Sequence, residues 1–310
     1  MAAALVLAGC TAGVDGRPVP GDDEPLTSAA LGELTTVDPC SLTGPGAFDG
    51  FGSARMPGMP TFDDCRVTVA VDGGHAHVWV GLLRDSATLR DGMTTVDRPG
   101  RGTTISSLDG TCAAALVLAD GVALTASAEP AYGSAPDEYT LCGLTEGALR
   151  GAYRVLDGGR VDHWVPPVSS LAVLDACDVV MIRHVQAALD LDTVDESPFP
   201  AGHRCRWGDP DGDPPGVDVE FRVAESPAGA DVPAGTGAEL VGGRGTWLVE
   251  QSDGDWVTCT AVTPHVEFAP GSGTHEYALL RVVTAPRRGR DVCAAARTLA
   301  ERVWPELPQL

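Results

Sequence analysis

The sequence predicts an α+β protein made of two tandem domains, each a mostly antiparallel sheet flanked by an N-terminal and a C-terminal helix and stapled by two disulfides. Three observations predict this class: four cysteines recur in order along each half, short strand patterns follow them, and an apolar helical pattern closes each half. At 310 residues, with 44% hydrophobic and 21% charged residues, the chain is long enough for two packed domains.

The cysteines carry the evidence for a repeat. Nine are present, and the eight that follow Cys10 form two sets of four. Successive cysteines lie 25, 47 and 30 positions apart in the first set and 28, 54 and 34 apart in the second. The first set is Cys40, Cys65, Cys112 and Cys142, and the second is Cys177, Cys205, Cys259 and Cys293. An Asp also stands two positions before the first cysteine of each set, so we predict an internal duplication.

The N-terminal residues resemble an export signal. An apolar run ends in Leu7-Ala8-Gly9-Cys10, the lipobox pattern in which the peptidase cuts before a cysteine that carries a lipid. Because no Lys or Arg precedes Cys10, we expect the positively charged part of the signal to lie upstream of the first residue. No window of 18 apolar residues occurs, so the expected attachment is a lipid anchor at the extracytoplasmic face of the cell membrane.

These patterns divide the chain into five segments. Residues 1–9 are the expected signal-peptide remnant, residues 10–34 a lipidated flexible tether, and residues 35–157 the first four-cysteine domain. Residues 158–170 form a linker rich in Gly and Pro, and residues 171–310 form the second four-cysteine domain.

Secondary structure is expected to follow one plan in both copies. In the first copy, alternating patterns predict strands at 65–71, 75–82, 111–118 and 122–128, then a helix at 141–156. In the second copy we predict a helix at 177–190, strands at 217–223, 246–250, 256–262 and 277–284, and a helix at 291–303. Each sheet is therefore expected to hold four or five strands, with a further helix opening the first copy near Cys40.

An exported chain with an even number of cysteines favours disulfides over thiol or zinc chemistry, and no CxxC motif is present. If each copy folds alone, three pairings remain possible in each. We favour the first cysteine with the second and the third with the fourth, because each bridge then joins a terminal helix to a neighbouring strand. The expected disulfides are Cys40–Cys65, Cys112–Cys142, Cys177–Cys205 and Cys259–Cys293.

The net charge of the chain limits the kinds of partner that it can attract. The formal net charge is −22, every basic side chain is Arg, and no basic cluster dense enough for phosphates occurs, so we expect no nucleic-acid partner. Such a surface is not attracted to anionic lipid heads either, so the lipid on Cys10 is the expected contact with the membrane.

Several short motifs together resemble a known family. They are the lipobox, a low-complexity tether, Asp38-Pro39-Cys40, Cys205-Arg206-Trp207, and Cys293 followed by an Ala-rich stretch. The chain resembles actinobacterial cell-envelope lipoproteins whose domain has no known function, here in two copies. It departs from them at Arg66-Val67, where a Trp is expected, and at Ala176, where a Pro is expected. The resemblance implies a location in the cell envelope and a pattern of disulfides. It does not imply any particular reaction.

No catalytic motif or cofactor-binding motif is recognisable, so we assign no catalytic residue, metal site or cofactor. His75 and His77 share one face of a predicted strand, and Asp209, Asp211 and Asp213 imitate the start of a calcium loop; we interpret both as solvated polar segments. The expected function is a non-enzymatic binding or interaction module for an unknown small ligand or an envelope protein. The alternatives are an extracytoplasmic hydrolase with an unrecognised active site and a structural envelope protein.

Overall fold

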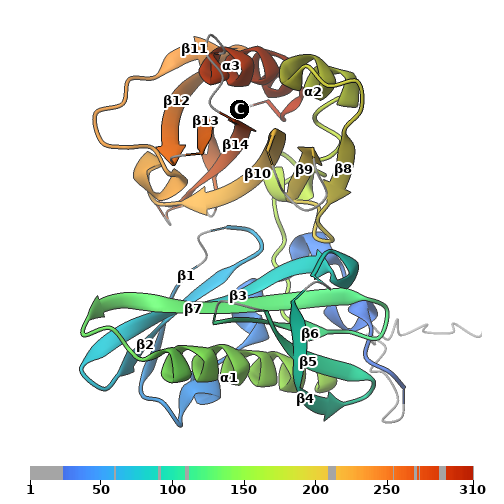
Figure 1. Ribbon diagram of the computed structural model, residues 1–310, viewed down its shortest axis with the longest axis vertical. Coiled ribbons are helices and arrows are strands. Elements are labelled where there is room, and N and C mark those ends of the chain that lie inside the picture. Colours follow the sequence, from blue (N-terminus) through green and yellow to red (C-terminus); the bar gives the residue numbers. More distant parts are fainter. Residues whose placement is uncertain are drawn as a thin grey trace, which may run out of the picture.

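The computed structural model describes residues 24–58, 61–89, 92–108, 112–208, 214–253, 255–268, 271, 273–285 and 291–309. It is an α+β protein with two antiparallel sheets of seven strands each (Figure 1). In Figure 1 the helices α1 and α3 lie at opposite ends of the molecule, with the two sheets between them. No helix in the described part of the chain is both long and apolar enough to cross a membrane.

The first half contains one sheet with the strand order β1-β2-β3-β7-β6-β5-β4. Its strands are β1 (Ala54–Gly58), β2 (Cys65–Val71), β3 (Gly74–Asp85), β4 (Met93–Gly100), β5 (Thr103–Leu108), β6 (Ala113–Val117) and β7 (Val122–Gly133). Helix α1 (Glu138–Asp157) follows β7 and packs across β7, β6 and β3. Asp137 caps this helix by accepting a hydrogen bond from the backbone N–H of Thr140 at 2.7 Å.

The second half repeats this arrangement. Its strands are β8 (Asp195–Pro198), β9 (Arg204–Gly208), β10 (Gly216–Ala224), β11 (Glu239–Val241), β12 (Arg244–Asp253), β13 (Trp256–Glu267) and β14 (His275–Thr284). Helix α2 (Ile182–Leu189) precedes the sheet, and α3 (Val292–Val303) follows it and packs on β13, β14 and β12. When β8 to β14 are matched in chain order with β1 to β7, the strand orders of the two sheets are identical. A shared order of this kind is what an internal duplication produces.

All four disulfides join the cysteines favoured by the sequence. They link Cys40 to Cys65, Cys112 to Cys142, Cys177 to Cys205 and Cys259 to Cys293. In each half, one bridge ties the segment before the sheet to an edge-side strand, and the other ties the closing helix to the sheet. Closing loops of this length stabilises a fold by about 3 kcal/mol each in the chain-entropy model.

The Asp that precedes the first cysteine of each set has a local structural role. The side chain of Asp38 accepts the backbone N–H of Cys40 at 2.8 Å, and the side chain of Asp175 accepts that of Cys177 at 2.8 Å. Such Asx turns compete with helix formation. The repeated Asp-x-Cys therefore marks a turn that presents the cysteine to its strand.

The structure corrects several expectations. Each sheet has seven strands, not four or five. In the described first half no α-helix precedes the sheet; residues Pro39–Leu42 and Pro45–Phe48 form separate 3-10 turns, because their prolines and the Asx turn prevent a continuous helix. In the second half, α2 begins at Ile182 rather than at Cys177.

The expected tether and linker are also partly structured. Leu26 and Leu31 are fully buried in the first core, so the described end of the predicted 10–34 tether belongs to the first domain. Within the 158–170 linker, Val161 is buried in the same core, and the backbone N–H of Trp164 donates to the carbonyl of Thr36 at 3.0 Å. The linker therefore lies against the first half rather than hanging free.

The two halves are joined by the connection between β1 and β2. Phe62, which belongs to the first half by sequence, is 1% exposed and lies in the core of the second half. Its ring centroid lies 5.9 Å from that of Trp164, 5.8 Å from Phe268 and 5.0 Å from His203. Thr61 also forms an isolated β-bridge with Arg222 of β10. We call residues Thr61–Asp64 the junction loop.

We predict that Phe62→Ala destabilises the second half more than the first, by about 3–5 kcal/mol, because the cavity opens in the second core. Hydrogen exchange in denaturant, read separately for each half, measures this. Phe48→Ala is the matched control, since Phe48 is fully buried in the first core. A loss confined to the first half in Phe62→Ala would contradict the assignment.

Candidate binding site

The first sheet leaves one face uncovered by its helix. Along β3, Ala76, Val78 and Val80 are fully buried beneath α1, while the alternate residues point to the other face. That second face carries Trp79 and Arg84 from β3. In Figure 1 it is the face of the first sheet that turns toward the second half.

A pocket of about 430 Å³ lies on this open face. Its floor comes from β3, β6 and β7, and the flanking segments close its sides. The lining residues are Asp64, Trp79, Leu82, Arg84, Leu89, Leu108, Ala113, Thr125, Ala126, Ser127 and Glu129. Leucines and the indole provide an apolar surface, and two carboxyl groups, two hydroxyls and one guanidinium provide polar contacts. This volume and mixture are typical of sites for small molecules.

At one end of the pocket, Trp79 is held in position by charged neighbours. Its indole N–H donates to a carboxylate oxygen of Glu129 at 3.2 Å. The guanidinium of Arg66 lies over the indole ring, 5.6 Å from the ring centroid. Both contacts come from neighbouring strands, so the orientation of the indole is set before any ligand arrives.

Asp64 stands where the junction loop meets the pocket. One of its carboxyl oxygens accepts the backbone N–H of Leu82 at 3.2 Å, and the other accepts the hydroxyl of Thr61 at 3.3 Å. Burial raises the pKa of Asp64 to about 7, and the nearby carboxyl groups of Asp63 and Glu220 act in the same direction. Near neutral pH this side chain can therefore either donate or accept a proton.

Arg84 connects the pocket with the second half. Its guanidinium lies 5.3 Å from the centroid of the Phe199 ring, and the guanidinium of Arg204 lies 4.9 Å from the same centroid. Burial and the nearby positive charges of Arg206 and Arg204 lower the pKa of Arg84. Arg84, which lines the pocket, is thus next to two further positive charges from the second half.

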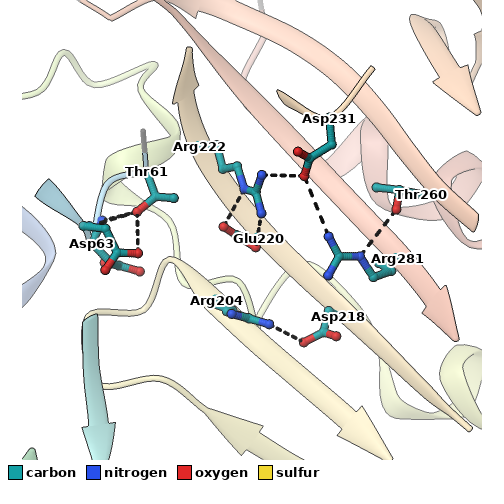
Figure 2. A network of polar contacts seen from close by, with 10 residues as sticks. Thr61, Asp63, Arg204, Asp218, Glu220, Arg222, Asp231, Thr260 and Arg281 are labelled. Carbon is teal, nitrogen blue, oxygen red and sulfur yellow. Dashed lines mark hydrogen bonds and ion pairs between the residues drawn. The ribbon is translucent and has the colours of Figure 1, made fainter. Parts of the chain in front are cut away.

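Both sheets carry a small apolar cluster on the face away from the closing helix. In the first half Leu89, Ala115 and Ala123 form it beside the pocket, and in the second half it includes Ala230, Val232, Val249 and Leu279, near the 3-10 turn Pro227–Ala230. Beside the second cluster, Arg222 of β10 binds Glu220 of the same strand at 2.6 Å and Asp231 after the turn at 2.6 Å (Figure 2).

A buried histidine–aspartate pair holds the junction loop in place. Nδ1 of His203 lies 2.7 Å from a carboxylate oxygen of Asp63, and its Nε2 lies 3.1 Å from the carbonyl of Ala172. Both partners only accept hydrogen bonds, so both ring nitrogens carry protons. Burial lowers the pKa of His203, but the charge and hydrogen bond of Asp63 raise it by more, and the net pKa is raised. With side chains 1% and 6% exposed, the pair is a structural contact rather than a catalytic dyad.

The other candidates from the sequence lie outside this pocket. His75 stacks on Tyr132 with ring centroids 4.0 Å apart, and Nδ1 of His77 lies 3.2 Å from the hydroxyl of Thr68. Two groups of potential metal ligands occur among the described residues, each composed of a disulfide and one glutamate, and disulfide sulfurs are not thiolate ligands. Asp209, Asp211, Asp213 and the predicted lipid site Cys10 lie outside the described residues.

Comparison of the chain with family models, with curated proteins and with solved structures finds no match. The pocket was not predicted from the sequence, because its residues come from six separate segments between Asp64 and Glu129. The alternation of His77 and Trp79 along one strand indicated a polar face, but Arg84 reaches this face only because β3 bulges between Val80 and Leu83, which the sequence pattern does not reveal.

We predict that the titration of Asp64 makes the protein less stable as the pH rises from about 4 to about 7. Folded Asp64 titrates at about 7 rather than at its ordinary 3.8, so the folded state holds a proton that the unfolded state has lost. The raised pKa of His203 acts in the same direction above 6.5, whereas burial lowers the pKa values of His77, His184 and His265, which act in the opposite direction. Calorimetry of the wild type and of a variant without the Asp64 carboxyl group, across this range, isolates the contribution of Asp64.

Asp64→Asn should remove the part of the decrease in Tm with rising pH that Asp64 causes below neutral pH. Asp97→Asn is the matched control, because the hydrogen bond from Arg150 lowers the pKa of Asp97 and its titration lies below the tested range. An unchanged slope in Asp64→Asn would contradict the assignment.

Proposed function

We propose that this chain is an extracytoplasmic lipoprotein, anchored by a lipid on Cys10, whose first half binds a small polar ligand in the pocket on its open sheet face without transforming it. The observation that carries the proposal is the pocket of about 430 Å³ on that face, whose lining combines an apolar surface from Trp79 and three leucines with carboxyl, hydroxyl and guanidinium groups.

The proposed extracytoplasmic location is supported by the cysteines and the charge of the chain. The lipobox ends at Cys10, and the other eight cysteines are bonded to one another, so the thiol of Cys10 is left over from the disulfide set. Structural disulfides persist in oxidising compartments and are rare in the cytosol. The acidic net charge leaves a lipid as the means of attachment.

The binding role is supported by the rigidity of the site. The pocket floor is a hydrogen-bonded sheet, Trp79 is oriented by two neighbours, and the junction loop is fixed by the buried Asp63–His203 contact. A pre-formed site of this kind loses little entropy when it binds.

An acid–base hydrolase is the second candidate, and one observation favours it. Asp64, with a pKa of about 7, and Glu129 line the same pocket. Two carboxyl groups, of which one has a raised pKa, are a common arrangement for general acid–base catalysis. No histidine is among the residues that line the described pocket, so the hydrolase would have to use carboxyl groups.

The lipid anchor is tested by metabolic labelling. When the chain is expressed behind a functional leader in an actinobacterial host, an alkyne analogue of palmitate should label the wild type and not Cys10→Ala. The matched control is a host that lacks the prolipoprotein acyl-transfer enzyme, in which the wild type should also stay unlabelled. Equal labelling of Cys10→Ala, or an unlabelled wild type that reaches the envelope, would contradict the proposal.

The pocket is tested by fragment screening with ligand-observed NMR. Fragments should bind the wild type, and Ser127→Trp should weaken that binding by about tenfold or more, because an indole would fill the floor. Thr298→Trp is the matched control, since Thr298 lines a separate groove between α2 and α3. Binding lost in the control and kept in Ser127→Trp would refute the site. Turnover of a bound fragment, abolished in Asp64→Asn, would establish the hydrolase instead.

A further inference from the structure

Positive charge gathers at the end of the pocket where the two halves meet. Arg84 reaches there from β3, and Arg204 and Arg206 reach there from β9. The guanidinium groups of Arg84 and Arg204 both lie over Phe199, 5.3 and 4.9 Å from its centroid. This concentration occurs in a chain whose formal net charge is −22.

The carboxylates nearby leave part of this charge unbalanced. Arg204 and Arg206 both use the same oxygen of Asp218, at 3.3 and 3.1 Å. Glu220 is already bound to Arg222 at 2.6 Å. Among the described residues Arg84 forms no ion pair, and Nε of Arg204 is buried without a hydrogen-bond partner.

Three guanidinium groups around one carboxylate repel one another, and partial burial makes the repulsion more costly. A cluster of this kind is stabilised when an anion occupies the space between its members, because Arg binds carboxylates and phosphates through paired, charge-assisted hydrogen bonds. Arg84 is the member that also lines the pocket, so its charge is available to a ligand there.

We infer that the ligand of this pocket carries a carboxylate or a phosphate group, that Arg84 binds this group, and that Arg204 and Arg206 reinforce it from the second half. The inference rests on the proposed binding function and names the ligand class for the same site. The rest of the pocket accepts the remainder of the ligand. Trp79 and the leucines at positions 82, 89 and 108 suit an apolar or ring-shaped body, and Thr125 and Ser127 offer hydroxyls.

The strand geometry sets the size of that body. Trp79 and Arg84 lie opposite Ser127 and Ala123 of β7, four residues apart, because β3 bulges between them, and four residues of extended strand span roughly 13 Å. A bare inorganic anion would occupy only the Arg84 end. We therefore expect an aryl acid to bind more tightly than inorganic phosphate.

The test uses the intact chain and three aryl probes titrated by calorimetry: phenyl phosphate, benzoate and the neutral benzamide. At least one charged probe should bind about tenfold or more tightly than benzamide, and Arg84→Gln should remove that advantage. Arg84→Lys, which keeps the charge but loses the planar fork, should retain part of it. Arg154→Gln is the matched control, because Arg154 is exposed on α1, on the opposite side of the first sheet.

Comparing the affinities for phenyl phosphate and benzoate shows which acidic group the ligand carries. Preference for phenyl phosphate assigns a phosphate ester, and preference for benzoate assigns a carboxylic acid. Equal affinity for benzamide, or binding that Arg84→Gln leaves unchanged, overturns the inference. If Ser127→Trp still abolishes that binding, the proposed pocket stands without its anionic ligand; if it does not, both fail.

Discussion

In each half the closing helix packs on one face of a seven-stranded sheet, together with α2 in the second half, and the opposite face must be covered by something else or remain open to solvent. Most other features of the molecule follow from that constraint. The second half covers part of its open face with residues near the turn Pro227–Ala230 and with ion pairs such as Arg222–Glu220. The first half has an apolar cluster around Leu89 on this face with a pocket beside it, and its junction loop enters the neighbouring core.

The identical strand orders are what an internal duplication produces, and the open faces of the two sheets carry different side chains. The disulfides, the Asp-x-Cys turns and the closing helices are the same in both halves, because they determine the fold. The open faces differ because they are free to change without altering the strand order. The first half has the pocket, and Arg204 and Phe199 of the second half lie next to Arg84 at its edge.

Features that depend on local sequence were predictable. Strands with clear alternation, such as Cys65–Val71, and helices with a capping Asp, such as α1, were found within a few residues. The disulfides are the pairing that we favoured among three for each copy, because it joins the segment at each end of a copy to a neighbouring strand. Strands β4 and β5 were missed because Met93–Gly100 and Thr103–Leu108 are rich in Thr and Ser and lack an apolar alternation. Likewise, Leu26 and Leu31 stand in a low-complexity stretch that gives no sign of burial.

The site itself depends on long-range contacts, which one sequence does not reveal. Asp63 and His203 are 140 positions apart, and Phe62 stands beside its own first-half strand while packing in the other core. This has a consequence for the order of folding during synthesis. Phe62 is made before the residues that surround it, so its ring stays exposed until the later half of the chain is available. A second half produced alone would lack this ring and would fold with a cavity in its core. The second half therefore needs the first to complete its packing, although each has its own sheet.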